Sequence, residues 1–232
     1  MKLRTLMAVV LALLVAAVHA ADEKRKAGVE KPPIVTAEEW GSKPQPIPES
    51  RQHTPQYITI HHAGVDWSAK RTPEEFVRRM QEWGQREKNW PDLPYHFLIA
   101  PDGRIFEGRP LKYEPESNTE YLLQGNIGVE MMGNFETQRP TPQQLESCVK
   151  LVAWLAQELS IETTNIRGHK DAAPQQTSCP GKDFQRYLDD GQFIKWVQRT
   201  MQGEPVEINP GPPLKGGPTE QVPVASSEPP QE

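Results

Sequence analysis

The stretch IRGHKDAAPQQTSCPGKDF, residues 166–184, restricts the possible folds of this chain more than any other. It contains His169 and Cys179, and an imidazole and a thiolate are both good zinc ligands. A third ligand must come from elsewhere, and the β-rich run YITIHHAG, residues 57–64, carries His61 at a strand end. Two His and one Cys leave a fourth zinc position free, as in catalytic sites. We therefore expect a fold that brings His61 to the His169–Cys179 loop, with Zn²⁺ as cofactor.

Length and composition suit one globular domain with flanking segments. The chain has 232 residues, of which 36% are hydrophobic. Its formal net charge is −5, so it has no overall basic character. We therefore expect no nucleic acid among its partners.

Residues 1–20 have the pattern of a secretory signal peptide. Lys2 and Arg4 precede an apolar run over residues 6–18, and small residues before Ala21 suit cleavage. The run is short for a membrane span, and no later segment is long and apolar enough to be one. We expect an exported protein, periplasmic or secreted, with no transmembrane segment in the mature chain; an uncleaved anchor is the alternative.

Two cysteines in an exported chain also permit a disulfide between Cys148 and Cys179. Cys148, however, lies on the apolar face of a predicted helix, where a free Cys behaves as a small hydrophobe. The disulfide would explain neither His61 nor His169, whereas a zinc site explains both. We favour zinc, and the disulfide stays open as the alternative.

The order of predicted elements indicates a single α/β domain. Capping signatures start helices at Thr72 and Thr141, the first ending near Gly84. Residues 111–124 have little periodicity and are expected to form a long surface loop beside a cleft. Strands are expected at residues 57–61, 95–99, 104–107 and 126–132, and one or two closing helices over 184–197. We predict a central mixed β-sheet flanked by helices.

The segments on either side of this domain differ from it in amino-acid composition. We place the domain at residues 36–202. Residues 21–35 are polar and charged and predict a flexible arm, and residues 203–232 are rich in Pro and Gly and predict a disordered tail.

Five segments of the chain resemble one known family. They are EEWG, ITIHHAG, YHFLIAPDGRIFEGRP, NIGVEMMGNFE and GHKDAAPQQTSCPG, in the order seen in the zinc amidases related to peptidoglycan recognition proteins and phage lysozyme-type amidases. The resemblance implies the peptidoglycan recognition protein-like amidase fold. It also implies N-acetylmuramoyl-L-alanine amidase activity, which cuts the amide between the muramyl lactyl group and L-Ala of the stem peptide.

The resemblance aligns His61, His169 and Cys179 with the three zinc ligands. The alternative for His61 is a hydrogen-bonded core histidine at a strand end. His62 is expected to point to the other side of the strand and to be a packing residue, or one that supports the ligands. His96 is expected to be structural.

Three further residues are candidates for catalysis. Tyr95 corresponds to a site-lining Tyr in many relatives and could donate to a developing oxyanion, or be a half-buried strand Tyr. Thr177 could bind the same oxygen or make a local turn bond. Glu130 lies in an apolar strand, where burying a carboxylate costs free energy unless the group has a partner or a task. We therefore favour it as the general base; the alternative is a Glu paired to Arg or Lys. A bacterial branch carries such a Glu, but usually with Asp in place of Cys179.

The sequence leaves two other functions in view. A recognition domain could bind peptidoglycan without cutting it, although in this family loss of the Cys usually accompanies loss of activity. Within the enzyme class, the substrate could be polymeric peptidoglycan or soluble muropeptides. The oligomeric state does not follow from the sequence.

Overall fold

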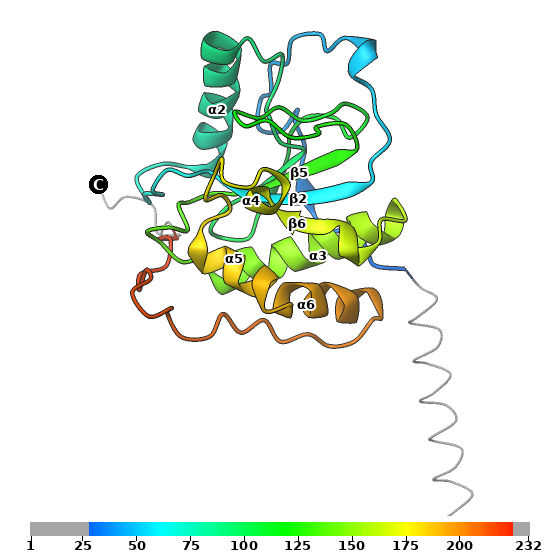
Figure 1. Cartoon of the computed structure of the whole chain (residues 1–232). Helices are drawn as coiled ribbons and strands as arrows, with labels where there is room; N and C mark the ends of the chain where they lie inside the picture. Colours follow the sequence, from blue (N-terminus) through cyan, green and yellow to red (C-terminus); the bar gives the residue numbers. More distant parts are fainter. Residues whose placement is uncertain (1–27, 225–232) are drawn as a thin grey trace, which may run out of the picture.

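The computed structural model describes residues 28–224, so the predicted signal peptide lies outside the described residues. One six-stranded sheet crosses the domain, with helices on both faces (Figure 1). Its strand order is β1-β4-β3-β5-β2-β6. The strands are β1 (Ile34–Val35), β2 (Tyr57–His62), β3 (Phe97–Ile99), β4 (Ile105–Glu107), β5 (Asn126–Met131) and β6 (Ile166–Gly168). The predicted α/β class and mixed sheet are confirmed.

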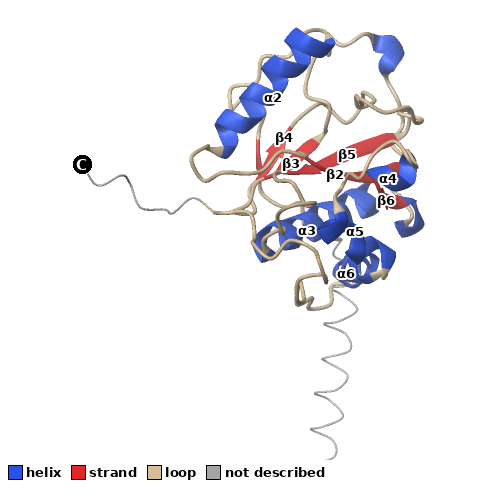
Figure 2. Ribbon diagram, turned by 60° about the vertical axis from the view of Figure 1, so that its left-hand side comes forward, coloured by secondary structure: helices blue, strands red, loops and turns tan. Residues whose placement is uncertain are grey.

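The two faces of the sheet are covered unequally. Helix α2 lies over one face, and α3, α5 and α6 lie together over the other (Figure 2). The helices are α2 (Pro73–Lys88), α3 (Pro142–Glu158), α4 (His169–Ala172), α5 (Lys182–Asp189) and α6 (Gln192–Met201), with short 3-10 turns η1 (Glu49–Arg51) and η2 (Thr163–Asn165). Apolar residues on the inner sides of these helices are buried against the sheet and form the core.

Four neighbouring strands, β3, β5, β2 and β6, run parallel, and β4 returns antiparallel to β3. The β3–β4 hairpin turns at Pro101-Asp102-Gly103, where Gly103 has a positive φ of 87°. The carboxyl ends of the parallel strands meet at one edge of the sheet. That edge is where open α/β sheets usually hold their functional groups.

The predicted helix starts are found, and the first helix ends about one turn beyond Gly84. The side chain of Thr72 accepts from the backbone N–H of Glu75 and completes a capping box at the start of α2. The helix continues past Gly84 to Lys88. Gly84 packs closely on Trp90 instead, because a Cβ there would lie 3.2 Å from the Trp90 ring. The absence of a side chain at Gly84 lets Trp90 pack against the helix, and Gly84 does not terminate it.

Cys148 and Cys179 are both free thiols among the described residues, so the alternative disulfide is not formed. Cys148 lies on α3, fully buried in the apolar core. It behaves there as a small hydrophobe, and burial raises the pKa of its thiol.

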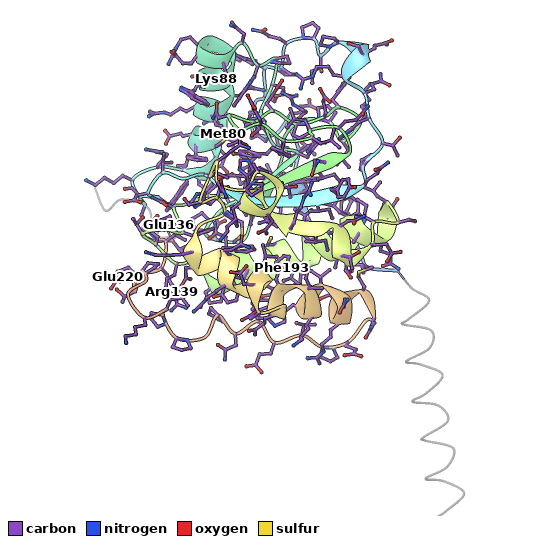
Figure 3. All side chains as sticks on the ribbon, in the orientation of Figure 1. Met80, Lys88, Glu136, Arg139, Phe193 and Glu220 are labelled. Carbon is purple, nitrogen blue, oxygen red and sulfur yellow. The ribbon has the colours of Figure 1, made fainter. Side chains whose placement is uncertain are left out.

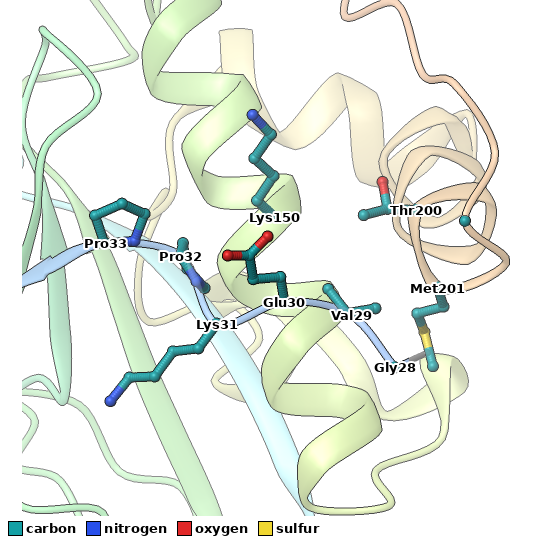
Figure 4. Close-up of a pocket in the computed structure, with 10 residues that line it drawn as sticks. Gly28, Val29, Glu30, Lys31, Pro32, Pro33, Lys150, Thr200 and Met201 are labelled. Atoms are coloured by element: carbon teal, nitrogen blue, oxygen red, sulfur yellow. The ribbon is translucent and has the colours of Figure 1, made fainter. Parts of the chain in front are cut away.

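Residues 28–35 of the predicted flexible arm pack on the domain, which corrects that part of the prediction. The strand β1 pairs in parallel with β4 at the sheet edge. The backbone N–H of Val29 donates to the Gln157 side chain at 2.6 Å. In Figure 4 the arm runs along α3 beside Lys150, with Met201 of α6 close to its beginning. Hydrogen bonds of the main chain hold this polar segment on the domain. Amino-acid composition gives no sign of such bonds.

Residues 203–224 also differ from the predicted disordered tail, since they pack on the domain. Arg139 donates to the carbonyls of Pro210 and Gly211, and its backbone pairs with Glu220 (Figure 3). Val222 is 1% exposed and fits where Gly133 has no side chain. Arg139 of the domain donates hydrogen bonds to carbonyl groups of the tail. The tail can therefore stay attached to the domain with few apolar side chains of its own.

Candidate functional site

The sheet register brings distant residues together at the carboxyl edge. Ile60 of β2 pairs with Gly168 of β6, so the next residues, His61 and His169, are neighbours. Their ring centroids lie 4.5 Å apart. On the other side, His61 pairs with Glu130 of β5. Three adjacent parallel strands therefore deliver two imidazoles and a carboxyl group to one place.

Cys179 completes the cluster from the loop that follows α4. Its carbonyl accepts from the backbone N–H of Lys170 at 2.6 Å, which closes the loop on itself. Its Sγ lies 3.7 Å from Nδ1 of His61 and accepts the backbone N–H of His62 at 3.3 Å. One donor atom each from His61, His169 and Cys179 lies within 4.8 Å of the others. The three predicted ligands thus form a cluster that can hold a metal ion.

A cavity of about 200 Å³ opens over this cluster. His61, His169 and Cys179 lie in its wall but are only 2%, 8% and 7% exposed. The other lining residues are His62, Ala63, Gly64, Trp90, Pro94, Tyr95, Glu116, Ser117, Asn118, Thr119 and Thr177. A small ion or a water molecule can reach the donors, whereas bulk solvent is mostly excluded.

Burial sets the protonation states of these donors. It lowers the pKa of His169 to about 4 and, with the neighbouring histidines, holds the pKa of His61 well below its usual value. Both imidazoles are therefore neutral at physiological pH, with a lone pair available. Burial raises the pKa of Cys179 to about 12. A cation at the cluster would reverse this effect, because a coordinating thiol loses its proton.

Glu130 is fully buried, and neither of its carboxyl oxygens has a hydrogen-bond partner among the described residues. It makes no ion pair there, so the alternative of a Glu paired to Arg or Lys does not hold. Burial raises its pKa well above the usual range. It does not line the cavity itself but lies next to His61 on the adjacent strand. An unpartnered carboxyl group in a core is costly and needs another explanation than packing.

Tyr95 lines the cavity, with its ring centroid 4.9 Å from that of His61. Burial, followed by the charges of Cys179 and Glu130, raises the pKa of its phenol well above the usual value, so it remains a donor. Gly128 makes this position possible, because a Cβ there would lie 3.2 Å from the Tyr95 ring.

Thr177 also lines the cavity, and its Oγ1 accepts the backbone N–H of Cys179 at 3.0 Å. This is the local turn bond weighed as the alternative for this residue. Because the bond uses only the oxygen as acceptor, the hydroxyl proton can still be donated elsewhere.

His62 and His96 have structural partners. His62 accepts the backbone N–H of Phe135 at its Nδ1, 3.0 Å away, while its own backbone N–H donates to Sγ of Cys179. His96 accepts the N–H of Gly128 at Nδ1 and contacts the carbonyl of Tyr113 through Nε2, at 2.9 and 2.8 Å. Both nitrogens of His96 are therefore occupied.

The sequence pointed to no individual residue of the loop between β4 and β5, although it placed a cleft wall there. Residues 116–119 of this loop line the cavity. The Oγ1 of Thr119 lies 2.6 Å from Nε2 of His169. A short run of Ser, Asn and Thr in an aperiodic loop carries no recognisable signal, because such residues are ordinary loop residues.

The sequence pattern of the N-acetylmuramoyl-L-alanine amidase family matches residues 51–182, which include the whole cluster. The chain belongs to this family.

Relatives in the family include both recognition proteins and amidases. Peptidoglycan recognition protein 1 of Mus musculus is 28% identical over 164 residues, covering 70% of this chain and 89% of the mouse protein. Among solved structures, the N-acetylmuramoyl-L-alanine amidase LysC of Clostridium intestinale superposes with a TM-score of 0.57 at 28% identity, covering 70% of this chain and 97% of LysC. A mutant of Drosophila PGRP-LB, solved in complex with tracheal cytotoxin, gives a TM-score of 0.53 at 26% identity, covering 64% of this chain and 88% of the Drosophila chain.

The helices within residues 28–224 are all too short or too polar to cross a membrane. The predicted fold and family are confirmed by these comparisons.

Proposed function

We propose that this protein is a zinc-dependent amidase that hydrolyses the bond between N-acetylmuramic acid and L-alanine in peptidoglycan. The observation that carries the proposal is the cluster of His61, His169 and Cys179, three donors within 4.8 Å in the wall of a small cavity. Membership of the amidase family supports the same reaction.

The donor set fits zinc. Two zinc ligands, one N and one S, at tetrahedral angles lie ~3.6 Å apart when the bond lengths are typical. The Nδ1 of His61 and Sγ of Cys179 are 3.7 Å apart. When bound, zinc would supply Lewis-acid polarisation of the amide and would lower the pKa of a water to about 7.

The remaining roles fall to side chains around the cluster. Glu130 acts in its ionised form: its carboxylate takes a proton from the water that attacks the amide carbon and returns it to the leaving nitrogen. The phenol of Tyr95 donates to the carbonyl oxygen as negative charge develops there, and the hydroxyl of Thr177 assists from the Cys179 loop. The raised pKa makes the Glu130 carboxylate a stronger base, which suits a group that accepts a proton from water and holds it until the nitrogen leaves.

The direct test is product analysis with purified, zinc-loaded protein. Incubation with peptidoglycan should release stem peptides with a free L-alanine amino terminus and leave intact glycan chains. Cys179→Ala should release none. Release of sugars without free stem peptides, or no release by zinc-loaded protein, would contradict the proposal.

A non-catalytic recognition domain is the second candidate, favoured by relatives that are named recognition proteins. Co-sedimentation with insoluble peptidoglycan distinguishes the two: binding retained without any release favours recognition. A parallel assay on soluble muropeptides would show whether polymeric glycan is required. We further propose that the protein is exported, which amino-terminal sequencing of the mature chain would test at Ala21.

A further inference from the structure

The loop between β4 and β5 contacts a predicted zinc ligand through a side chain that the proposed reaction does not use. The Oγ1 of Thr119 lies 2.6 Å from Nε2 of His169. Ser117 supports Thr119 from within the loop, because its Oγ accepts the N–H of Thr119 at 3.1 Å and lies 2.9 Å from Oγ1 of Thr119. The hydroxyl is therefore fixed in position and not free to rotate toward solvent.

A second contact holds the same loop to the segment that carries Cys179. The backbone N–H of Glu120 donates to the side-chain oxygen of Gln176 at 2.8 Å, and the Gln176 amide donates back to the Glu120 carbonyl at 2.9 Å. The base of the loop is fixed by Glu116, which pairs with Arg51 and with the fully buried Arg109. The loop thus bridges a rigid base and the metal-binding segment.

The contact with Thr119 decides which nitrogen of His169 is available to a metal. A neutral imidazole has one donor nitrogen and one acceptor nitrogen. With Thr119 at Nε2, the nitrogen left for an ion is Nδ1, and its lone pair is available when Nε2 carries the proton. His61 also presents Nδ1 to Cys179, so the two histidines would bind in the same way.

We propose that Thr119 is a positioning residue for the metal: its hydroxyl accepts the Nε2–H of His169 and so fixes the tautomer and the ring plane that leave Nδ1 to zinc. The Glu120–Gln176 pair holds Thr119 there. The inference rests on the proposed zinc site. Partners of this kind fix ligating histidines, and their loss typically lowers metal affinity by about 10–100-fold.

The test is zinc affinity, measured by competition with a chelating dye. Thr119→Val keeps the shape but removes the acceptor, and we expect its affinity to fall about 10–100-fold. Thr119→Ser keeps the hydroxyl and should rescue affinity to near the wild-type value. Thr200→Val removes a hydroxyl that bonds the Trp196 carbonyl in α6, and it controls for the substitution itself.

Equal affinity of Thr119→Val and the wild type would overturn the inference alone. Equal losses in Thr119→Val and Thr119→Ser would do the same, because the hydroxyl would then not matter. A wild-type protein that binds no zinc would overturn the proposed function itself, so the two failures are distinguishable.

Nitrogen-15 NMR of the histidine side chains in the zinc-loaded protein gives an independent readout. We expect the proton of His169 on Nε2 in the wild type. A proton on Nδ1 would overturn the inference, whatever the affinities.

Discussion

The buried polar cluster around Arg109 and the one around His61 differ in whether their polar atoms have partners. Arg109 donates to the carbonyls of Leu93 and Glu114, at 2.8 Å each, and pairs with Glu116 at 3.2 Å. In the other cluster, Nε2 of His61 and both oxygens of Glu130 have no partner among residues 28–224. The first cluster is built for stability, whereas the second keeps unsatisfied groups beside a cavity, as functional sites do.

The sharpest way to break this comparison is Glu130→Gln. If Glu130 acts as the general base, the rate constant for amide hydrolysis should fall by about 10²–10⁴-fold, because proton transfer is lost. The free energy of unfolding should change by less than ~1 kcal/mol, because an amide replaces an unpartnered carboxyl group of similar size. Steady-state kinetics and chemical denaturation measure the two effects. Loss of stability with activity retained would assign Glu130 to the scaffold.

Arg109→Met tests the paired cluster and should have the opposite profile. Removing one partner of a buried pair leaves Glu116 and the carbonyls of Asp92, Leu93 and Glu114 short of donors, so the free energy of unfolding should fall by about 3–5 kcal/mol. Chemical denaturation measures it. Arg86→Met is the control, since Arg86 pairs with Glu87 on the surface, and its unfolding midpoint should not move. An unchanged midpoint in Arg109→Met would remove the contrast between the clusters.

Much of this arrangement was predictable because it follows local rules. The capping signatures at Thr72 and Thr141 start α2 and α3, and the β-rich run with His61 forms β2. The convergence of His61 with His169 and Cys179 followed from the chemistry of the donors and from resemblance. Those signals lie within short windows of sequence.

What could not be predicted depends on contacts between distant segments. The tail is held by Arg139 and Tyr187, whose donors bind the Pro210 carbonyl, and Pro/Gly-rich composition gives no sign of such capture. Gly84 of α2 gives room to the Trp90 ring, a contact that exists only once the chain turns back after the helix. The contact of Thr119 with His169 arises only once the loop is folded over the strand ends.

The Tyr95→Phe substitution tests whether the phenol in the cavity wall takes part in catalysis. Loss of one donor to a developing oxyanion typically costs about 10²–10³-fold in kcat. KM should change little, because the bond forms in the transition state. The matched control is Tyr57→Phe, at the far end of β2, which should retain full activity. A kcat for Tyr95→Phe equal to that of the wild type would reduce Tyr95 to a packing residue.

Thr177→Val should have the smallest effect of the series. It removes the acceptor for the Cys179 N–H, worth about 1 kcal/mol of stability. We expect kcat to fall by about tenfold, the equivalent of 1.4 kcal/mol, and Thr177→Ser to retain both properties. Thermal unfolding and kinetics on the pair of variants measure this. A larger loss of kcat than in Tyr95→Phe would reverse their order of importance.

The metal content of the purified protein tests the central claim most directly. His61, His169 and Cys179 are proposed to hold one catalytic ion with an open position, which takes three protein ligands. Elemental analysis of the wild type should find about one zinc per chain, and Cys179→Ala should lose it or bind it much more weakly. A wild-type protein that takes up no zinc, or a Cys179→Ala protein that holds it as tightly, would contradict the account.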